Sequence, residues 1–201
     1  HYDGATVDAI PYIPEAINQQ IKETARGHDV ILVELGGTAG EYQNVVYYEA
    51  YRILKLQYPE DVVHIHVTYF PKPPHIGELK SKPTQLSVKM LNGMGIQPDM
   101  VVGRAEDMID DVRKEKVAFY CNLDKQDVIS NPDSDTIYRI PKILRDQKMD
   151  ERILQKLGMD VQQPDLSRWD ELVDKITAEH EESVTVGIIA KYIATGDDEL
   201  V

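Results

Sequence analysis

The sequence predicts an α/β domain in which a mostly parallel sheet is flanked by helices. The main observation is that short apolar runs alternate with longer amphipathic stretches, which is typical of βαβ units around a parallel sheet. The length of 201 residues suits one α/β domain, alone or with an appendage. Hydrophobic residues make up 42% of the chain, which is enough for a packed core and argues against global disorder.

The strands are predicted from the apolar runs. They are, in chain order, Ala5–Ile10, Val30–Leu35, Val62–Tyr69, Met100–Gly103 and Val117–Tyr120, with a short one at Val128–Ile129. Pro11 ends the first run. The second run is apolar almost throughout, as expected of a strand buried on both faces, whereas the third alternates between polar and apolar residues.

The helices are predicted from the amphipathic stretches between these runs. They are, in chain order, Pro14–Ala25, Val45–Tyr58, Thr84–Leu91 and Ile137–Leu157, the last broken into two helices near Met149. Gly27 ends the first helix, and Gly93 and Gly95 end the third. The segment Pro71–Pro83 is predicted to be irregular because it holds four prolines and a glycine.

Composition divides the chain into three predicted parts. Residues 1–158 form part of a domain, which we expect to be truncated at its N-terminus because the sequence begins with histidine instead of methionine. Residues 159–183 form a linker with an amphipathic helix at Leu166–Ala178. Residues 184–201 begin with an apolar run, Val184–Ala190, that is predicted as a strand. Because a lone strand cannot bury itself, we expect it to start a second domain.

The formal net charge of -13 disfavours nucleic acids and anionic membranes as partners, so a phosphate site must be a local cluster of cations. No apolar run reaches the roughly 18 residues that span a bilayer, and no signal peptide is visible. The single cysteine, Cys121, excludes an internal disulfide and suits a reducing cytoplasm, which is the expected location. It follows aromatic residues in an apolar run, so we interpret it as a core residue.

The stretch K-S-K-P-T-Q, which begins at Lys80, is the strongest indication of a binding site. Pro83 suits the first turn of a helix, where free N–H groups and the helix dipole favour an anion. Ser81 and Thr84 add hydroxyl donors, and Lys80 and Lys82 add two charges suited to phosphate. The alternative is a capped helix with two solvated lysines.

Three further charged residues lie next to predicted strand ends. Glu34 precedes the glycine-rich turn G-G-T-A-G, where a carboxylate suits Mg²⁺ held against nucleotide phosphates. The same pattern also fits a tight turn with an incidental glutamate. Arg104 follows a strand, where its guanidinium can clamp a phosphate or stack on a base. Lys116 precedes a predicted strand and is interpreted as a solvated lysine.

Six runs occur in this order: G-A-T-V-D-A-I-P-Y-I, V-E-L-G-G-T-A-G, G-E-L-K-S-K-P-T-Q-L-S-V-K, G-I-Q-P-D, V-A-F-Y-C-N and D-T-I-Y-R-I-P. Together they resemble the synthetase (amidoligase) domain of the CTP synthase family, and V-T-V-G-I-I-A-K-Y resembles the first strand of the family's glutaminase domain. The resemblance implies a fold like that of P-loop NTPases and dethiobiotin synthetase. It also implies a reaction in which ATP phosphorylates the 4-oxygen of UTP and glutamine-derived ammonia displaces that phosphate to give CTP.

The resemblance also assigns roles by position. The residues that match the family's site for UTP, or for CTP as feedback inhibitor, are Glu41, Tyr42, Gln43, Lys80, Ser81, Lys82, Pro83, Thr84, Gln85 and Lys116. Those that fall where the family holds ATP are Arg104, Pro132, Asp133 and Ser134. Glu34 matches the family's Mg²⁺-binding glutamate. Because the family's tetramers build the UTP site across a subunit interface, we expect a homotetramer in which Lys116 reaches that site.

Several positions depart from the family pattern. The usual Asp-Ile-Glu at positions 41–43 is Glu-Tyr-Gln here, which bears on nucleotide discrimination and on feedback by CTP. Asp8 and Tyr12 replace glutamine and histidine near the expected pyrimidine pocket, and Pro132 replaces a frequent lysine. We expect the family's phosphate loop before residue 1 and its glutaminase triad after residue 201, so the chain alone should be inactive. The alternatives are a divergent paralogue that amidates another substrate and a non-catalytic, nucleotide-binding regulatory or filament-forming subunit.

Overall fold

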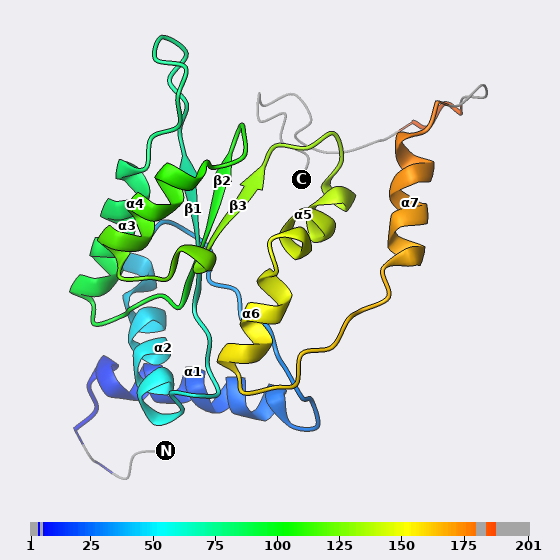
Figure 1. Ribbon diagram of the computed structural model, residues 1–201. Coiled ribbons are helices and arrows are strands. Elements are labelled where there is room, and N and C mark those ends of the chain that lie inside the picture. The colour runs from blue at the N-terminus through cyan, green and yellow to red at the C-terminus, as the bar shows by residue number, and fades with distance from the viewer. Residues whose placement is uncertain (1–3, 5, 180–183, 188–201) are drawn as a thin grey trace.

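The computed structural model describes residue 4 and residues 6–179 and 184–187. Its centre is a sheet of three parallel strands in the spatial order β1–β2–β3 (Figure 1). The strands are β1 (Ile65–Phe70), β2 (Met100–Ala105) and β3 (Val128–Pro132). Because all three run in the same direction, their carboxyl ends share one edge of the sheet, called the carboxyl edge below. The predicted fold class, an α/β domain with a parallel sheet, is confirmed.

Helices cover both faces of this sheet and give the domain three layers (Figure 1). One face carries α3 (Lys82–Gly93) and α4 (Asp111–Cys121). The other face carries α5 (Ile140–Asp146) and α6 (Met149–Lys156), so the predicted break near Met149 is confirmed. Phe70, at the end of β1, is fully buried in the core beneath α3 and α4.

Two further helices, α1 (Ala9–Ala25) and α2 (Val45–Gln57), pack against each other below the sheet, opposite its carboxyl edge (Figure 1). The buried amide of Asn18 donates a hydrogen bond to a backbone carbonyl of α2 at 2.9 Å. The C-terminal part of α2 is fixed to the sheet by Lys55, whose Nζ lies 3.3 Å from the Asp99 carboxylate. These contacts hold the helix pair at the amino ends of the strands.

The last described helix, α7 (Ser167–Thr177), packs on a 3₁₀ turn at Ile137–Arg139. The Trp169 indole Nε1 donates to the backbone oxygen of Tyr138 at 2.5 Å, and Val173 is buried. The helix predicted in this part of the sequence is therefore confirmed. None of the helices that the structure describes combines the length and apolar character that a membrane span requires.

The outer side of β3 is occupied by a side chain. Gln147 accepts a hydrogen bond from the Ser130 backbone N–H at 2.8 Å and donates one to the Ser130 carbonyl at 2.7 Å. The same amide also binds the Ile143 carbonyl and the Lys114 ammonium group. The Gln147 amide thus takes the place that a neighbouring strand would have beside Ser130.

The predicted strand at Val117–Tyr120 is wrong, because this run belongs to α4. Its start is capped by Asp110, whose carboxylate accepts a hydrogen bond from the Arg113 N–H at 2.9 Å. Val117 and Cys121, one helical turn apart, are buried, whereas Phe119 is 81% exposed. A short apolar run fits a strand and one side of a helix equally well, and here the cap and the core contacts favour the helix.

Two further predicted strands are not observed. Of Ala5–Ile10, the described residues have no strand, and Ala9 and Ile10 belong to α1. Val30–Leu35 forms no strand either, and the Leu32 side chain is 95% exposed. In the part of the chain that the structure describes, no strand pairs with this segment, so its backbone has no ladder to join. Of Val184–Ala190, residues 184–187 have no regular structure, and the rest lies outside the described residues.

Candidate functional site

The stretch that begins at Lys80 lies at the carboxyl edge, between β1 and α3. The Lys80 N–H donates to the Pro71 carbonyl at 2.9 Å, which closes the neck of the projecting loop between them (Figure 1). Ser81 immediately precedes the helix, and Pro83 lies in its first turn. The predicted helix start with an early proline is confirmed, and its free N–H groups point toward this edge.

Three polar side chains of this stretch serve packing. Thr84 is fully buried, with its hydroxyl 3.2 Å from that of Thr68 on β1. The Gln85 amide donates to the Ser81 hydroxyl at 3.1 Å, and both side chains are buried. The Thr84 contact holds α3 on the sheet, and the Gln85 contact fixes the first turn of the helix. Of the rest of the stretch, Lys82 and Pro83 are exposed and Lys80 is partly buried.

The two lysines differ in their surroundings. The Lys80 ammonium lies 3.1 Å from Oε1 of Glu78, and the other oxygen of Glu78 pairs with the guanidinium of Arg113 on α4. The hydrogen bond from Lys80, followed by the attraction of both cations, lowers the pKa of Glu78. Lys82 is exposed and forms no ion pair with any residue that the structure describes. Arg113 was not predicted as a site residue, because it lies outside the K-S-K-P-T-Q motif and reaches this stretch only through the fold.

The residues predicted for ATP are gathered at the ends of β2 and β3. Arg104 is exposed and pairs in register with Asn131 of β3. Pro132 ends β3, and the Asp133 N–H donates to the Ala105 carbonyl at 2.9 Å. The neighbouring Ser134 is exposed as well. The structure therefore brings Arg104, Pro132, Asp133 and Ser134 to one place on the carboxyl edge.

An ion-pair bridge joins this place to the loop in front of α3. The Lys72 ammonium lies 2.8 Å from the Glu106 carboxylate and 2.6 Å from that of Asp107. Hydrogen bonds to the two carboxylates, that of Asp107 first, raise the pKa of Lys72. Both predicted nucleotide regions thus occupy the same edge of the sheet, where ligands of open α/β sheets collect.

The glycine-rich turn forms a compact unit before the short 3₁₀ helix Tyr42–Asn44. The Glu41 carboxylate accepts hydrogen bonds from the Thr38 backbone N–H at 2.9 Å and from the Gln43 amide at 3.0 Å. These two hydrogen bonds, the first more than the second, lower the pKa of Glu41. Gly37 has a φ of 91°, and a Cβ there would lie 2.6 Å from the Glu41 carboxylate, so the turn favours glycine at this position.

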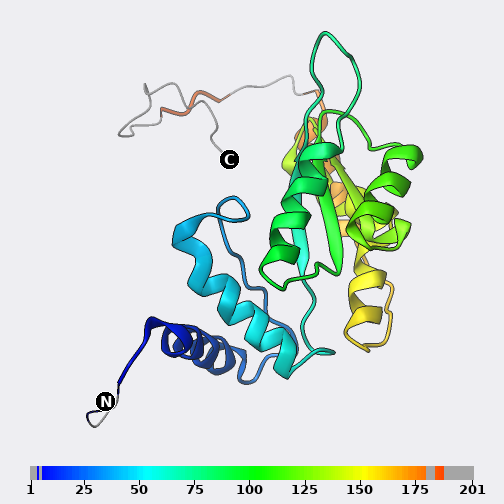
Figure 2. The ribbon, with the colours of Figure 1, turned by 90° about the vertical axis from the view of Figure 1, so that its left-hand side faces the viewer.

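This turn packs beside α3 (Figure 2), but not at the start of that helix. A Cβ at Gly40 would lie 2.2 Å from the terminal methyl of Met90, which is eight residues after Lys82. The rise of an α-helix places these two helix positions about 12 Å apart. Within one chain, the segment Glu41–Gln43 therefore lies beside the C-terminal half of α3, and Tyr42 is 94% exposed.

Glu34 lies in the irregular segment before this turn, with its carboxylate exposed. Among the residues that the structure describes, no group of three or more His, Cys, Asp and Glu side chains is arranged to hold a metal ion. A single exposed carboxylate still suits Mg²⁺, which commonly takes one or two protein carboxylates and completes its shell with water and nucleotide phosphates. The donor set present therefore fits a metal that binds together with a nucleotide.

Lys116 lies on the exposed side of α4, not before a strand as predicted. No contact between described residues joins it to the other predicted site residues. Phe119 and Tyr120 follow on the same helix with their rings 5.3 Å apart, and both are exposed. The interpretation of Lys116 as a solvated lysine agrees with its exposure within this chain.

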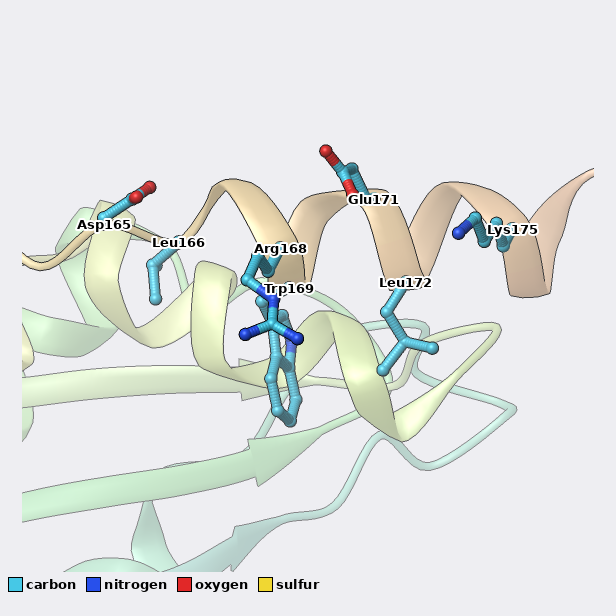
Figure 3. Close-up of a pocket in the computed structure, with 7 residues that line it drawn as sticks. All are labelled: Asp165, Leu166, Arg168, Trp169, Glu171, Leu172 and Lys175. Atoms are coloured by element: carbon cyan, nitrogen blue, oxygen red, sulfur yellow. The ribbon is translucent and has the colours of Figure 1, made fainter.

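Two pockets lie away from these residues. One runs along α7 and is lined by Asp165, Leu166, Arg168, Trp169, Glu171, Leu172 and Lys175 (Figure 3). The other lies on α1 and includes Asp8 and Tyr12, two of the positions that depart from the family pattern. Neither contains a residue predicted to bind a nucleotide or Mg²⁺, so the candidate site is the open carboxyl edge.

A family model described as "CTP synthase N-terminus" matches residues 1–159. The chain belongs to this family. It is 38% identical to the CTP synthase of Pyrococcus abyssi over 200 residues, which are 99% of this chain and 37% of that protein. It is 41% identical to the CTP synthase of Methanopyrus kandleri over 199 residues, 98% of this chain and 37% of that protein.

A bacterial CTP synthase, that of Bdellovibrio bacteriovorus, is 42% identical over 193 residues, which are 96% of this chain and 36% of that protein. The chain thus spans little more than a third of the length of these CTP synthase relatives. The family resemblance predicted from the motifs is confirmed.

Proposed function

We propose that this chain is the nucleotide-binding part of a CTP synthase, a ligase that converts UTP to CTP in pyrimidine biosynthesis. ATP phosphorylates the 4-oxygen of UTP, and ammonia released from glutamine by a glutaminase domain displaces the phosphate. The observation that carries this proposal is the meeting of two predicted nucleotide regions at one carboxyl edge, in a chain of this family. Phosphoryl transfer needs such a convergence, because its catalysis consists mainly of positioning and charge stabilisation.

In this proposal the UTP triphosphate binds at the start of α3. Lys80 and Lys82 supply charge, and the free N–H groups after Ser81 supply hydrogen bonds. Thr84 positions the helix against β1, and Gln85 fixes the Ser81 side chain at the helix start. CTP, as feedback inhibitor, would use the same triphosphate contacts.

The ATP adenine would lie at Arg104, Pro132, Asp133 and Ser134. Glu34 would hold Mg²⁺ together with nucleotide phosphates, where the ion would neutralise charge on the transferred phosphoryl group.

The remaining predicted UTP residues support a site shared between subunits. Glu41, Tyr42, Gln43 and Lys116 are exposed or partly exposed, and within one chain the turn lies about two helical turns from the start of α3. A homotetramer in which a second subunit supplies these side chains would bring the two sets together. We therefore propose a cytoplasmic homotetramer with the pyrimidine nucleotide at a subunit interface.

A second candidate function is favoured by the Glu41-Tyr42-Gln43 sequence. Here the Glu41 carboxylate is engaged by Thr38 and Gln43, and Tyr42 extends into solvent. A changed contact to the base would give a related amidoligase with another nucleotide substrate. Comparing product formation from UTP with that from other nucleoside triphosphates separates the two.

The test is an assay of CTP formation by the full-length protein with UTP, ATP and ammonia. Lys82→Ala removes a cation that pairs with no residue in the described part of the chain, and we expect KM for UTP to rise roughly 10- to 100-fold, the size of one charged hydrogen bond. Lys89→Ala, which removes an exposed lysine from the same helix, is the matched control and should leave KM unchanged. Binding of UTP without formation of CTP would refute the proposed reaction.

A further inference from the structure

Four charged side chains form a continuous row beside the start of α3. They are, in spatial order, Lys80, Glu78, Arg113 and Asp110. Glu78 stands in the middle of the first three, with one carboxylate oxygen on Lys80 and the other on Arg113. Lys80 therefore already has an anionic partner within its own loop.

Arg113 is held from three directions. Its Nε donates to the Leu79 carbonyl at 2.6 Å, and its two terminal nitrogens pair with Asp110 and Glu78. Asp110 is itself fixed as the N-cap of α4, where it accepts the Arg113 N–H. The Arg113 side chain is 21% exposed, compared with 54% for Glu78. Arg113 is thus held in place by several contacts, whereas Glu78 is largely exposed to solvent.

This arrangement conflicts with binding of a triphosphate unless the row rearranges. A phosphate at the Lys80 ammonium would approach Glu78, which carries the same sign of charge. The exposed Glu78–Lys80 pair is weak, so a multiply charged ligand can replace the carboxylate. When it does, Glu78 keeps its contact to Arg113.

We propose that Glu78 is an exchangeable counter-ion of Lys80, and that Arg113 is a positioning residue that retains Glu78 when a triphosphate takes its place on Lys80. This inference rests on the proposed function, because it takes Lys80 as a triphosphate ligand. Its consequence is that Glu78 lowers the affinity of the site and reduces occupation of Lys80 by weaker anions.

The first test measures KM for UTP and binding of inorganic tripolyphosphate by the full-length protein. Glu78→Gln keeps the size of the side chain and removes its charge. KM for UTP and the dissociation constant of tripolyphosphate should therefore both fall by about two- to fivefold, the range of an exposed ion pair. The gain should disappear near 1 M salt, where the Debye length is only about 3 Å. Glu49→Gln, which removes a glutamate paired with Arg52 on α2, is the control and should change neither.

The second test separates positioning from simple support of the loop. Arg113→Met should weaken UTP binding by about two- to fivefold, because Lys80 is then the one cation among the described residues that pairs with Glu78. Arg113→Met should have little effect on UTP binding when it is combined with Glu78→Gln. Arg113→Lys alone should bind UTP as well as the wild type does, because lysine keeps the positive charge. If Arg113 only supported the Leu79 carbonyl, the effects of Glu78→Gln and Arg113→Met on UTP binding would add, and Arg113→Lys would bind UTP as weakly as Arg113→Met.

The outcomes separate this inference from the proposed function. Binding of tripolyphosphate without binding of UTP would overturn the proposed function, while the Glu78→Gln comparison with tripolyphosphate would still decide the role of Glu78. Unchanged or weaker binding in Glu78→Gln, together with CTP formation by the wild type, would overturn the counter-ion role alone. Failure to bind either ligand would overturn both.

Discussion

The ion cluster around Asp127 offers a sharp test of how the domain is held together. Asp127 ends the 3₁₀ turn Lys125–Asp127 just before β3, and its carboxylate is almost completely buried. One oxygen accepts from Arg152 Nε at 2.8 Å, and the other lies 2.7 Å from the same guanidinium and 2.8 Å from Lys156. Both cations come from α6, so this carboxylate fixes that helix to the strand. The perturbation is Asp127→Asn.

The expected cost follows from the exposure of the three groups. Asp127 is 3% exposed, and the side chains of Arg152 and Lys156 are 21% and 26% exposed. Removing one partner of a buried ion pair costs about 3–5 kcal/mol, because the remaining charge is left uncompensated. The two cations keep some contact with water, and Arg152 keeps a partner in Asp124 at 3.3 Å. We therefore expect a loss near the lower limit, about 3 kcal/mol.

Hydrogen exchange in the full-length protein measures this loss locally. The amides of β3 and α6 should exchange about 100-fold faster in Asp127→Asn, since 1.4 kcal/mol corresponds to a factor of about ten. Asp124→Asn is the matched control, because Asp124 pairs with the same arginine but its side chain is 79% exposed. It should change exchange by only about twofold. Equal effects of the two variants would refute the reasoning that burial determines the strength of this cluster.

Three further predictions concern other parts of the fold. The pKa of His64 lies at about 4, below the ordinary 6.5, mainly because the ring is buried. The unfolded chain therefore takes up this proton first, and the free energy of unfolding should fall by about 3 kcal/mol as the pH drops from about 6.5 to 4. His64→Phe should flatten that part of the profile in denaturant titrations. Gly37→Ala should cost about 1–2 kcal/mol in the same titrations, because its φ is 91° and the new Cβ would displace the Glu41 carboxylate. Gln147→Leu should cost about 1–3 kcal/mol, because it leaves two backbone groups at the buried Ser130 without partners; an unchanged melting temperature would contradict this.

Local sequence patterns correctly predicted those strands and helices whose formation depends mainly on nearby residues. The run at Met100–Gly103 was correctly predicted as a strand, and the helix after Pro83 begins where the proline indicates. Val117–Tyr120 was misassigned because four apolar residues do not distinguish the two periodicities. Val30–Leu35 has the composition of a buried strand, but strand formation also needs a neighbour, which no local pattern reports.

In the candidate site, too, residues with a local sequence signal were predicted, whereas contacts between distant segments were not. Lys80 and Arg104 were predicted because they lie next to recognisable elements, and parallel strands bring them to one edge. The Glu78–Arg113 contact depends on how α4 packs against a loop 35 residues earlier in the chain, so the sequence contains no local signal for it. Lys116 was assigned to the UTP site only through the family resemblance, and its exposed position on α4 leaves that assignment as a proposal.

The Gln147 amide has a consequence for the architecture of any larger sheet. Extending the sheet past β3 would require Gln147 to release both backbone groups of Ser130, whereas β1 has a weaker contact of this kind, with the Thr84 hydroxyl 3.5 Å from the Tyr69 carbonyl. Growth of the sheet is therefore directional. Any strand that another segment or chain contributes should dock beside β1, next to the loop that leads to Lys80.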